Sequence, residues 1–220
     1  MTTLTEEENN SLKSYKVCVI GCGGLGGYII EMLGRIGIGH ITAVDADVFD
    51  ETNLNRQILS DTTLIGCSKA ISPFERMKKV NPDVVLKPLN IRFEAENGED
   101  ILKGHDVVVD ALDNAISKKL LSDLCFKLNI PFVHGAIGGW YGQVSTIFPG
   151  DKTLDILYKD PEVSGIEKKL GNPPFTPALV ASLEVTEVIK ILIKRGDLLR
   201  NKVLYVNLLN MDFDIIEFKE

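Results

Sequence analysis

Apolar runs alternate with amphipathic segments along the first two thirds of the chain. Residues 15–21 form an apolar, β-rich run that ends in glycines, which is typical of a buried parallel strand. Apolar residues at helical spacing follow over residues 24–37, and a second apolar run covers residues 40–47. Strands that alternate with helices predict βαβ units, a mainly parallel sheet and right-handed crossovers.

The same alternation continues to residue 140. It predicts a short helix over Glu6–Lys13, a helix over Gly66–Val80 that ends before Asn81–Pro82, a helix over 118–129, and strands over 84–91, 105–114 and 131–140.

The pattern changes after Trp140. A strand and turn are expected over 141–150, a surface loop rich in glycine, proline and lysine over 151–174, a long helix over 175–194, and two antiparallel strands over 203–209 and 213–218. The predicted fold class is therefore α/β. It is a Rossmann-like, mainly parallel sheet flanked by helices, with an antiparallel extension at the C-terminal end and a single domain over residues 1–220.

Composition narrows the classes of protein that fit. The 220 residues suit one domain, and 45% of them are hydrophobic, which is enough for a sizeable core. A formal net charge of -7 argues against broad nucleic-acid binding. No apolar run is long enough to span a bilayer, and the polar N-terminus lacks a signal-peptide pattern, so we expect a cytoplasmic protein with no membrane contact. The four cysteines form no C-x-x-C pair, so we expect free thiols and no structural zinc.

The residues that join the first predicted strand to its helix match G-x-G-x-x-G, with Gly21, Gly23 and Gly26 at the glycine positions. Glycines allow a tight turn and let the backbone approach a phosphate, and the helix N-terminus adds N–H groups and a positive dipole end. Asp45 ends the second strand, where an acid accepts hydrogen bonds from ribose hydroxyls. The loop and this acid predict nucleotide binding, and they also fit an NAD(P)-dependent oxidoreductase.

Polar residues after the second and fourth strands favour a triphosphate. A nucleoside triphosphate extends past the glycine loop and needs cationic partners. Arg56 offers a planar fork for phosphate oxygens, and Lys69, at the expected helix start, adds a point charge. Asp113 and Asn114 fall at the carboxyl edge of the sheet, where ligands bind in open α/β folds. A carboxylate there suits Mg²⁺, which takes one or two carboxylates plus phosphates.

Together these segments resemble the ThiF/MoeB/HesA family, the bacterial E1-like relatives of ubiquitin-activating enzymes. The resemblance rests on GCGGLGG, DADVFDETNLNRQ, the lysine of GCSK and DALDN, and it covers about residues 15–194. It implies an adenylyltransferase that binds Mg-ATP and adenylylates the C-terminal glycine carboxylate of a small ubiquitin-like sulfur carrier (ThiS- or MoaD-like, ending in Gly-Gly), with release of pyrophosphate. It also implies a homodimer.

The resemblance implies a site residue by residue. Arg56, Lys69 and Asp113 would act in catalysis, with Asp45 on the ribose and Asp113 on Mg²⁺. The implied nucleotide-binding residues are Gly21, Gly23, Gly24, Gly26, Asp45, Asp47, Asn53, Arg56, Gln57, Lys69, Asp113 and Asn114.

The sequence departs from the family pattern in three places. The paired C-x-x-C zinc ligands of many relatives are missing, and so is an Arg-Tyr-x-Arg-Gln segment whose arginine reaches into the neighbouring subunit. The stretch over residues 171–182 has no cysteine, so adenylylation is the predicted step and sulfur transfer is not. Cys67 is either a reactive thiol near the phosphates or a small packing residue. The glycine-rich stretch before Trp140 and Tyr141 suits an extended Gly-Gly tail, although both rings equally suit core packing.

Three other functions fit parts of the pattern. The glycine loop and Asp45 alone fit an oxidoreductase, although the sequence offers no evident hydride-site acid or base. A nucleotide-binding module without turnover fits the missing arginine segment and cysteine. Activation of a carboxylate on modified tRNA is disfavoured by the net charge of -7. The carrier and its pathway, thiamine, molybdopterin or another, are not encoded in these motifs.

Overall fold

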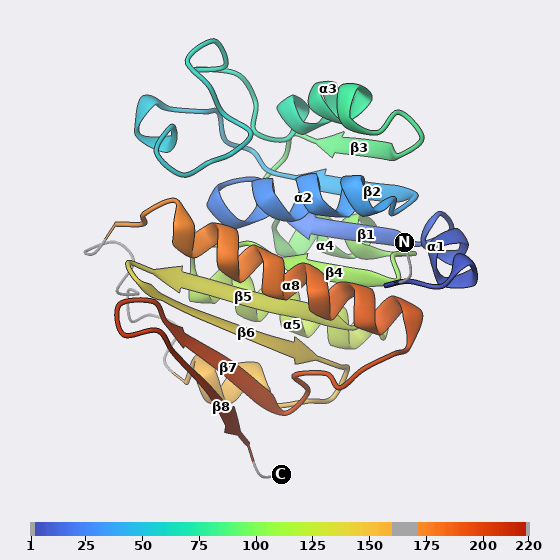
Figure 1. Ribbon diagram of the computed structural model, residues 1–220, viewed down its shortest axis with the longest axis vertical. Helices are drawn as coiled ribbons and strands as arrows, with labels where there is room; N and C mark the ends of the chain where they lie inside the picture. Colours follow the sequence, from blue (N-terminus) through green and yellow to red (C-terminus); the bar gives the residue numbers. More distant parts are fainter. Residues whose placement is uncertain (1–2, 160–170, 219–220) are drawn as a thin grey trace.

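An eight-stranded mixed sheet runs through the protein in a computed structural model that describes residues 3–159 and 171–218 (Figure 1). The strand order is β3-β2-β1-β4-β5-β6-β7-β8. The strands are β1 Lys16–Ile20, β2 His40–Val44, β3 Val85–Leu89, β4 Val107–Asp110, β5 Phe132–Gly138, β6 Tyr141–Ile147, β7 Lys202–Asn207 and β8 Asp212–Glu217. The strands β1 to β5 are parallel, and β6, β7 and β8 add to them antiparallel. The predicted α/β class with its C-terminal antiparallel extension is confirmed.

Helices cover both faces of this sheet. The helices are α1 Glu6–Leu12, α2 Gly24–Ile36, the 3₁₀ turn η1 Glu51–Asn53, α3 Ile71–Val80, α4 Ala95–Leu102, α5 Ala115–Leu128, α6 Thr153–Leu157 and α8 Phe175–Ile193. One core cluster joins α1, α2, α3 and α8 to one face, and a second joins α4, α5 and α6 to the other (Figure 1). Neighbouring residues of β1 divide accordingly, since Val17 and Val19 belong to the first cluster and Cys18 and Ile20 to the second.

The helix expected over Gly66–Val80 is shorter than predicted. Residues 66–70 form turns, Ser68 makes an isolated antiparallel bridge with Val48, and α3 begins only at Ile71. The amide of Lys69 donates to the carbonyl oxygen of Asp47 at 2.9 Å. Cys67 and Lys69 therefore precede the helix instead of forming its first turn, because backbone pairing with residues 47–49 holds this segment out of the helix.

Two helices fall where the sequence pattern predicted none. The helix α4 lies within a polar stretch after β3, and α6 lies in the segment predicted as a surface loop over 151–174. In α6, Thr153 and Leu154 are buried, so this part of the segment is not a surface loop. The rest of that prediction falls partly on residues 160–170, which lie outside the described residues.

The strand order reverses direction between β1 and β4, which are neighbours in the sheet. In doubly wound sheets a crevice opens at such a switch point, at the carboxyl ends of the strands. The glycine loop follows β1, and the residues 111–114 follow β4, so both predicted segments meet at this edge.

Candidate nucleotide site

The glycines of the loop have two different roles. Gly21 has a φ of +98°, and a Cβ atom there would lie 2.5 Å from the carbonyl oxygen of Ala111. A Cβ atom on Gly26 would lie 1.8 Å from the carbonyl oxygen of Gly21. These two glycines allow β1, α2 and the end of β4 to approach closely. Gly23 and Gly24 have no such close approach and, together with Gly21, line a cavity at the start of α2, where no side chain caps the helix.

Asp45 lies at the carboxyl end of β2 and is held in place by two backbone amides. Its Oδ2 accepts a hydrogen bond from the amide of Cys22 in the glycine loop at 2.7 Å. Its Oδ1 accepts one from the amide of Asp47 at 2.8 Å. Each carboxylate oxygen retains a second lone pair, and Asp45 lines the same cavity as Gly23. The acid is therefore fixed beside the loop, as ribose recognition requires.

The segment after β2 is shaped by local side-chain caps. Asp50 and Asn53 form reciprocal caps around η1, which turns the chain back toward α2. The guanidinium of Arg56 donates from Nη1 to the carbonyl oxygen of Thr52 at 3.0 Å and to the side chain of Asn55 at 2.9 Å. These contacts use one nitrogen of a group with five donor hydrogens.

Gln57 is the one residue of this segment with an orphaned polar atom. It is 5% exposed, its Oε1 is buried without a hydrogen-bond partner, and its Nε2 would lie 3.6 Å from a Cβ atom on Gly23. A buried amide oxygen without a partner is costly, so it indicates a bound group or water beside the glycine loop.

Lys69 and Asp47 form an ion pair across the same region. The Lys69 Nζ lies 3.4 Å from Asp47 Oδ2, and Lys69 is largely buried whereas Asp47 is exposed. A nearly buried ammonium with one long contact to an exposed carboxylate is well placed to exchange that partner for a phosphate. Asp47 therefore lies beside the candidate phosphate ligand Lys69.

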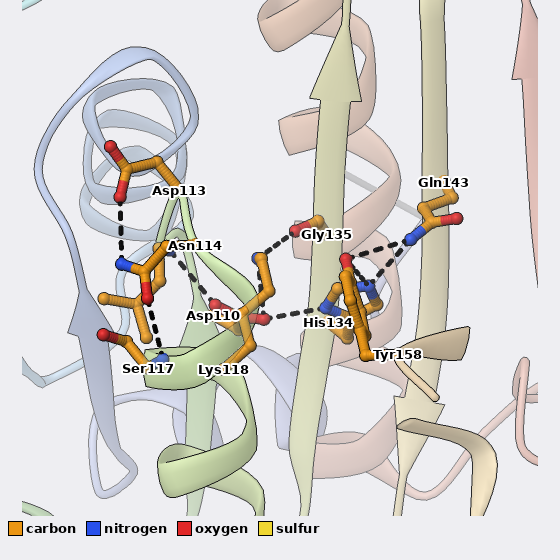
Figure 2. Close-up of polar contacts among 10 residues, drawn as sticks. Asp110, Asp113, Asn114, Ser117, Lys118, His134, Gly135, Gln143 and Tyr158 are labelled. Carbon is orange, nitrogen blue, oxygen red and sulfur yellow. Dashed lines mark hydrogen bonds and ion pairs between the residues drawn. The ribbon is translucent and has the colours of Figure 1, made fainter. Parts of the chain in front are cut away.

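Asp113 and Asn114 lie in the turn between β4 and α5, just beyond the strand end. The side chain of Asn114 caps α5 by accepting a hydrogen bond from the amide of Ser117 at 2.8 Å. Its Nδ2 donates to Asp113 Oδ1 at 3.3 Å. Both residues are exposed, and Figure 2 shows the Asp113 carboxylate pointing away from the buried groups below the turn.

A single cavity of about 1050 Å³ brings these residues together. It has the size expected of a site for a ligand as large as a nucleotide. Its lining includes every predicted nucleotide-binding residue except Gly26, whose place is in the packing beneath the loop. Sequence reasoning missed the part of the lining formed by Ile91–Ala95, Ile116, Lys118, Tyr158 and Asn172.

Below this cavity lies a buried polar cluster that the sequence pattern did not single out as a group. Asp110 is fully buried at the end of β4, and its Oδ2 accepts hydrogen bonds from Lys118 Nζ at 2.9 Å and from His134 Nδ1 at 2.7 Å (Figure 2). The second contact of Lys118 Nζ is the carbonyl oxygen of Gly135 at 2.8 Å. His134 Nε2 faces the side chains of Gln143 and Tyr158 at 3.2 and 3.3 Å.

The charges of this cluster follow from burial and from its one cation. Burial opposes ionisation of Asp110, but Lys118 and His134 together lower the pKa of this carboxyl below its usual value. Burial and the charge of Lys118 lower the pKa of His134, so the imidazole is neutral. An ionised carboxylate can only accept, so Nδ1 of His134 carries the proton and Nε2 accepts. His134 is thus a satisfied structural histidine.

Two features could have identified this cluster in the sequence. Asp110 and His134 each end or interrupt an apolar strand that must be buried on both faces, and a buried polar group needs a partner. Lys118 gave no such signal, because a lysine in an amphipathic helix is usually solvated.

The fold is Rossmann-like, with a cavity at its topological switch point that is the candidate nucleotide site. The chain belongs to the ThiF family, whose model matches residues 1–220. Its relatives include the SAMP-activating enzyme E1 of Haloferax volcanii, 33% identical over 100% of this chain and 82% of the relative. The sulfur carrier protein adenylyltransferase of Thermus thermophilus is 32% identical over 94% of this chain and 80% of the relative. The chain spans 56% and 55% of two other, longer relatives.

Solved structures share the fold. The crystal structure of E. coli MccB with MccA-N7isoASN superposes with a TM-score of 0.84 at 21% sequence identity, over 97% of this chain and 67% of that chain. The named relatives in sequence are adenylyltransferases or an activating enzyme, so this family membership makes the chain an adenylyltransferase that uses ATP.

Within residues 3–159 and 171–218, no three His, Cys, Asp or Glu side chains are grouped so that they could hold a metal ion by themselves. In the same residues, no helix combines the length and the apolar character that a bilayer crossing needs.

Proposed function

We propose that this chain adenylylates the C-terminal carboxylate of a small ubiquitin-like sulfur carrier that ends in Gly-Gly. The observation that carries the proposal is the single cavity in which the glycine loop, Asp45, Arg56, Lys69 and Asp113 meet. A carboxylate oxygen of the carrier bonds to the α-phosphorus of ATP. The bond from that phosphorus to the bridging oxygen breaks, and pyrophosphate leaves with the electron pair. The C-terminal carboxylate of the carrier is already ionised at neutral pH and is itself the nucleophile. The enzyme therefore needs to position this carboxylate and to neutralise the charge of the phosphates, and it needs no nucleophile of its own.

The residues present fit a nucleoside triphosphate. A Cβ atom on Gly24 would meet Arg56 at 3.9 Å and Pro177 at 3.7 Å, so the bare glycine leaves a cradle between the loop and the cation. The orphaned Oε1 of Gln57 lies in the same wall. In the proposed complex Asp45 accepts from the ribose, and Arg56 and Lys69 hold the phosphates, with Asn53 and Asp47 beside them.

Mg²⁺ is part of the proposal. When bound, the ion neutralises charge on the phosphate oxygens as pyrophosphate leaves. Asp113 is the proposed ligand, because its exposed carboxylate lines the cavity at the switch point and Asn114 is its neighbour. One protein carboxylate is sufficient, since Mg²⁺ in nucleotide sites takes most of its other ligands from phosphates and water.

A second cavity suits the tail of the carrier. Its lining comprises Asn55, Gly139, Trp140, Tyr141, Asn172 and Pro173. Asn172 lines both cavities, so the two adjoin. Trp140 is 43% exposed and packs on Phe175 with ring centroids 4.7 Å apart. An extended glycine tail is narrow and presents only backbone groups, which fits a passage walled by an aromatic ring and asparagine.

The assembly is also proposed from the family resemblance. We propose one adenylation domain over residues 1–220 that associates as a homodimer. Exposed apolar side chains on β8, Phe213 at 47% and Ile215 at 59%, leave a surface available for association. Sedimentation velocity at several concentrations tests this, and a monomer at every concentration would contradict it.

The experiment for the activity is ATP–pyrophosphate exchange with candidate carriers. We expect exchange that needs the last glycine of the carrier and is lost in Asp113→Ala and Lys69→Ala. Lys78→Ala is the matched control, because Lys78 is an exposed lysine paired with Glu75. The proposal is wrong if Asp113→Ala behaves as the wild type does, or if cognate carriers support no exchange. Thermal shifts with Mg-ATP and with NAD test the oxidoreductase alternative, because a ligand of the folded state raises its Tm.

A further inference from the structure

The Asp110 carboxylate connects three elements below the proposed Mg²⁺ ligand. Its Oδ1 accepts a hydrogen bond from the amide of Leu112 at 3.1 Å, which is within the turn after β4. Its Oδ2 accepts from Lys118 on α5 and from His134 on β5. Figure 2 shows all of these contacts converging on one buried side chain. The carboxylate therefore fixes the turn relative to both the next helix and the next strand.

The position of Asp113 depends on its two neighbours in the chain. Leu112 is held by Asp110, and Asn114 is held as the cap of α5. The side chain of Lys118 acts on the first anchor, since its Nζ donates to Asp110 and to the carbonyl oxygen of Gly135. The side chain of Asp113 is itself exposed. Its placement is therefore determined by the backbone of the turn rather than by packing of its own side chain.

The contribution of the Lys118–Asp110 ion pair to the stability of the folded protein does not explain why it is buried. The side chains of Lys118 and Asp110 are 4% and 0% exposed. Replacing such a pair by apolar groups of similar volume is often neutral or stabilising, because the desolvation of both ions offsets their attraction. Metal ligands, in contrast, commonly need outer partners that fix their orientation.

We propose that Asp110 and Lys118 are positioning residues that hold the turn 110–114 so that Asp113 can ligate Mg²⁺. This inference rests on the proposed role of Asp113 in the function above. It adds two buried residues that act through the backbone of the turn. Lys118 also lines the cavity, but its ammonium is bonded to Asp110 and to the carbonyl oxygen of Gly135.

The test is the affinity for Mn²⁺ of the complex with α,β-methylene-ATP, followed by electron paramagnetic resonance and independent of turnover. Lys118→Met alone leaves the Asp110 charge buried without a cationic partner, although its hydrogen bonds to Leu112 and His134 remain, and is expected to be strongly destabilised. The double variant Asp110→Leu/Lys118→Met removes both charges and the acceptor for Leu112. We expect it to fold and to bind Mn²⁺ roughly 10–100-fold more weakly, the usual effect of losing an outer partner of a metal ligand.

Glu184→Gln is the matched control. Glu184 is buried beside Gly135 in the same region, but neither of its carboxyl oxygens makes a hydrogen bond, so it does not hold the turn. We expect wild-type Mn²⁺ affinity in this variant. A folded double variant with wild-type Mn²⁺ affinity would overturn the inference, provided that Asp113→Ala loses the ion. Unchanged affinity in Asp113→Ala would instead reject the proposed metal ligand, and the inference with it.

A second variant covers the case in which the double variant does not fold. Asp110→Asn/Lys118→Met keeps the shape of the Asp110 side chain and removes both charges. The amide of Asn can accept from either Leu112 or His134 but must turn its hydrogens toward the other, so one of these two contacts is lost. We expect a smaller loss of Mn²⁺ affinity than in the first double variant, of about tenfold, which is the lower end of the outer-partner range. Unchanged affinity in this variant would also overturn the inference.

Discussion

Glu184 shows how strongly a single buried side chain can depend on its surroundings. It lies on the face of α8 that packs against β5, it is 0% exposed, and neither of its carboxyl oxygens has a hydrogen-bond partner. A Cβ atom on Gly135 would lie 2.3 Å from its carboxyl carbon, so the missing side chain of that glycine makes the space that the acid occupies. Burial and the nearby charge of Asp110, opposed by Lys118, raise the pKa of Glu184 well above its usual value.

A pH dependence of stability follows from this raised pKa. In the folded protein Glu184 keeps its proton, whereas in the unfolded chain it releases it above a pH of about 4.3. The folded state then binds more protons, so the contribution of Glu184 to stability is full below that pH and declines as the pH rises toward the folded pKa. Gln keeps the shape without a titrating proton. We therefore expect the Tm of Glu184→Gln minus that of the wild type to increase between about pH 4 and pH 8.

Thermal melts at several pH values measure this difference. For a chain of this size, each kcal/mol of relative stability corresponds to about 2–4 °C in Tm. Glu7→Gln, the same exchange at an exposed glutamate of α1, serves as the control for replacing a glutamate by glutamine. A difference for Glu184→Gln that is constant over the whole range would contradict the expected titration.

At the scale of elements, the sequence predicted the strands and helices whose apolar residues recur with the period of a strand or a helix. The strands β1, β2, β4 and β5 and the helices α2, α5 and α8 have periodic apolar positions that pack on the sheet, and all were predicted with small errors at their ends. The helix α4 was missed because its sequence is polar and contains Gly98, a poor helix former. In the structure a Cβ atom on Gly98 would lie 2.3 Å from Leu124, so that glycine allows α4 to pack closely on α5. Local capping, in which the amide of Glu94 donates to the side chain of Asn97 at 3.0 Å, and this tertiary contact together stabilise the helix.

The junction of β1 and α2 gives a test of the two kinds of glycine. In Gly26→Ala the new methyl group would overlap the carbonyl oxygen of Gly21, since the atoms would be 1.8 Å apart. Overpacking of this kind costs roughly 1–3 kcal/mol. In Gly24→Ala the nearest atom would lie at 3.7 Å, which is an ordinary contact. We expect Gly26→Ala to lower the Tm by several degrees, and Gly24→Ala to keep the Tm but weaken ATP binding.

Melting curves and calorimetric titration with ATP separate the two effects. The pair is matched, because both changes add one methyl group within three residues of the same helix start. Equal Tm values for Gly26→Ala and the wild type would show that Gly26 is not needed for the packing. Unchanged ATP affinity in Gly24→Ala would show that the space between Gly24 and Arg56 does not hold the nucleotide.

At the scale of the whole molecule, the site depends on which strand ends become neighbours. Motif spacing placed the glycine loop, Asp45 and Asp113 at strand ends, and the general rule for open α/β sheets then predicted one shared edge. The part of the cavity that was not predicted comes from residues whose local sequence carries no signal, such as Lys118 on a helix and Asn172 beyond α6. They reach the cavity only through the packing of α5 and the return of the chain to α8, which periodicity does not encode.

The adjoining cavities lead to a prediction about two substrates. Trp140 lines only the second cavity, away from the glycine loop, and it is supported by Phe175 at the start of α8. If the carrier tail passes this ring while ATP occupies the larger cavity, Trp140→Ala should affect one substrate alone. We expect the KM for the carrier to rise about tenfold or more, as for loss of an aromatic contact at the centre of an interface, with the KM for ATP unchanged.

Steady-state exchange assays with each substrate varied in turn measure the two constants. Phe126→Ala is the control, because Phe126 is an aromatic residue of α5 that is 62% exposed and lines neither cavity. Its KM values should match those of the wild type. A rise in the KM for ATP in Trp140→Ala would mean that the ring supports the nucleotide site instead, since α8 begins beside both cavities. Unchanged KM values for both ATP and the carrier would show that the carrier tail does not pass Trp140 and reaches the larger cavity by a different path.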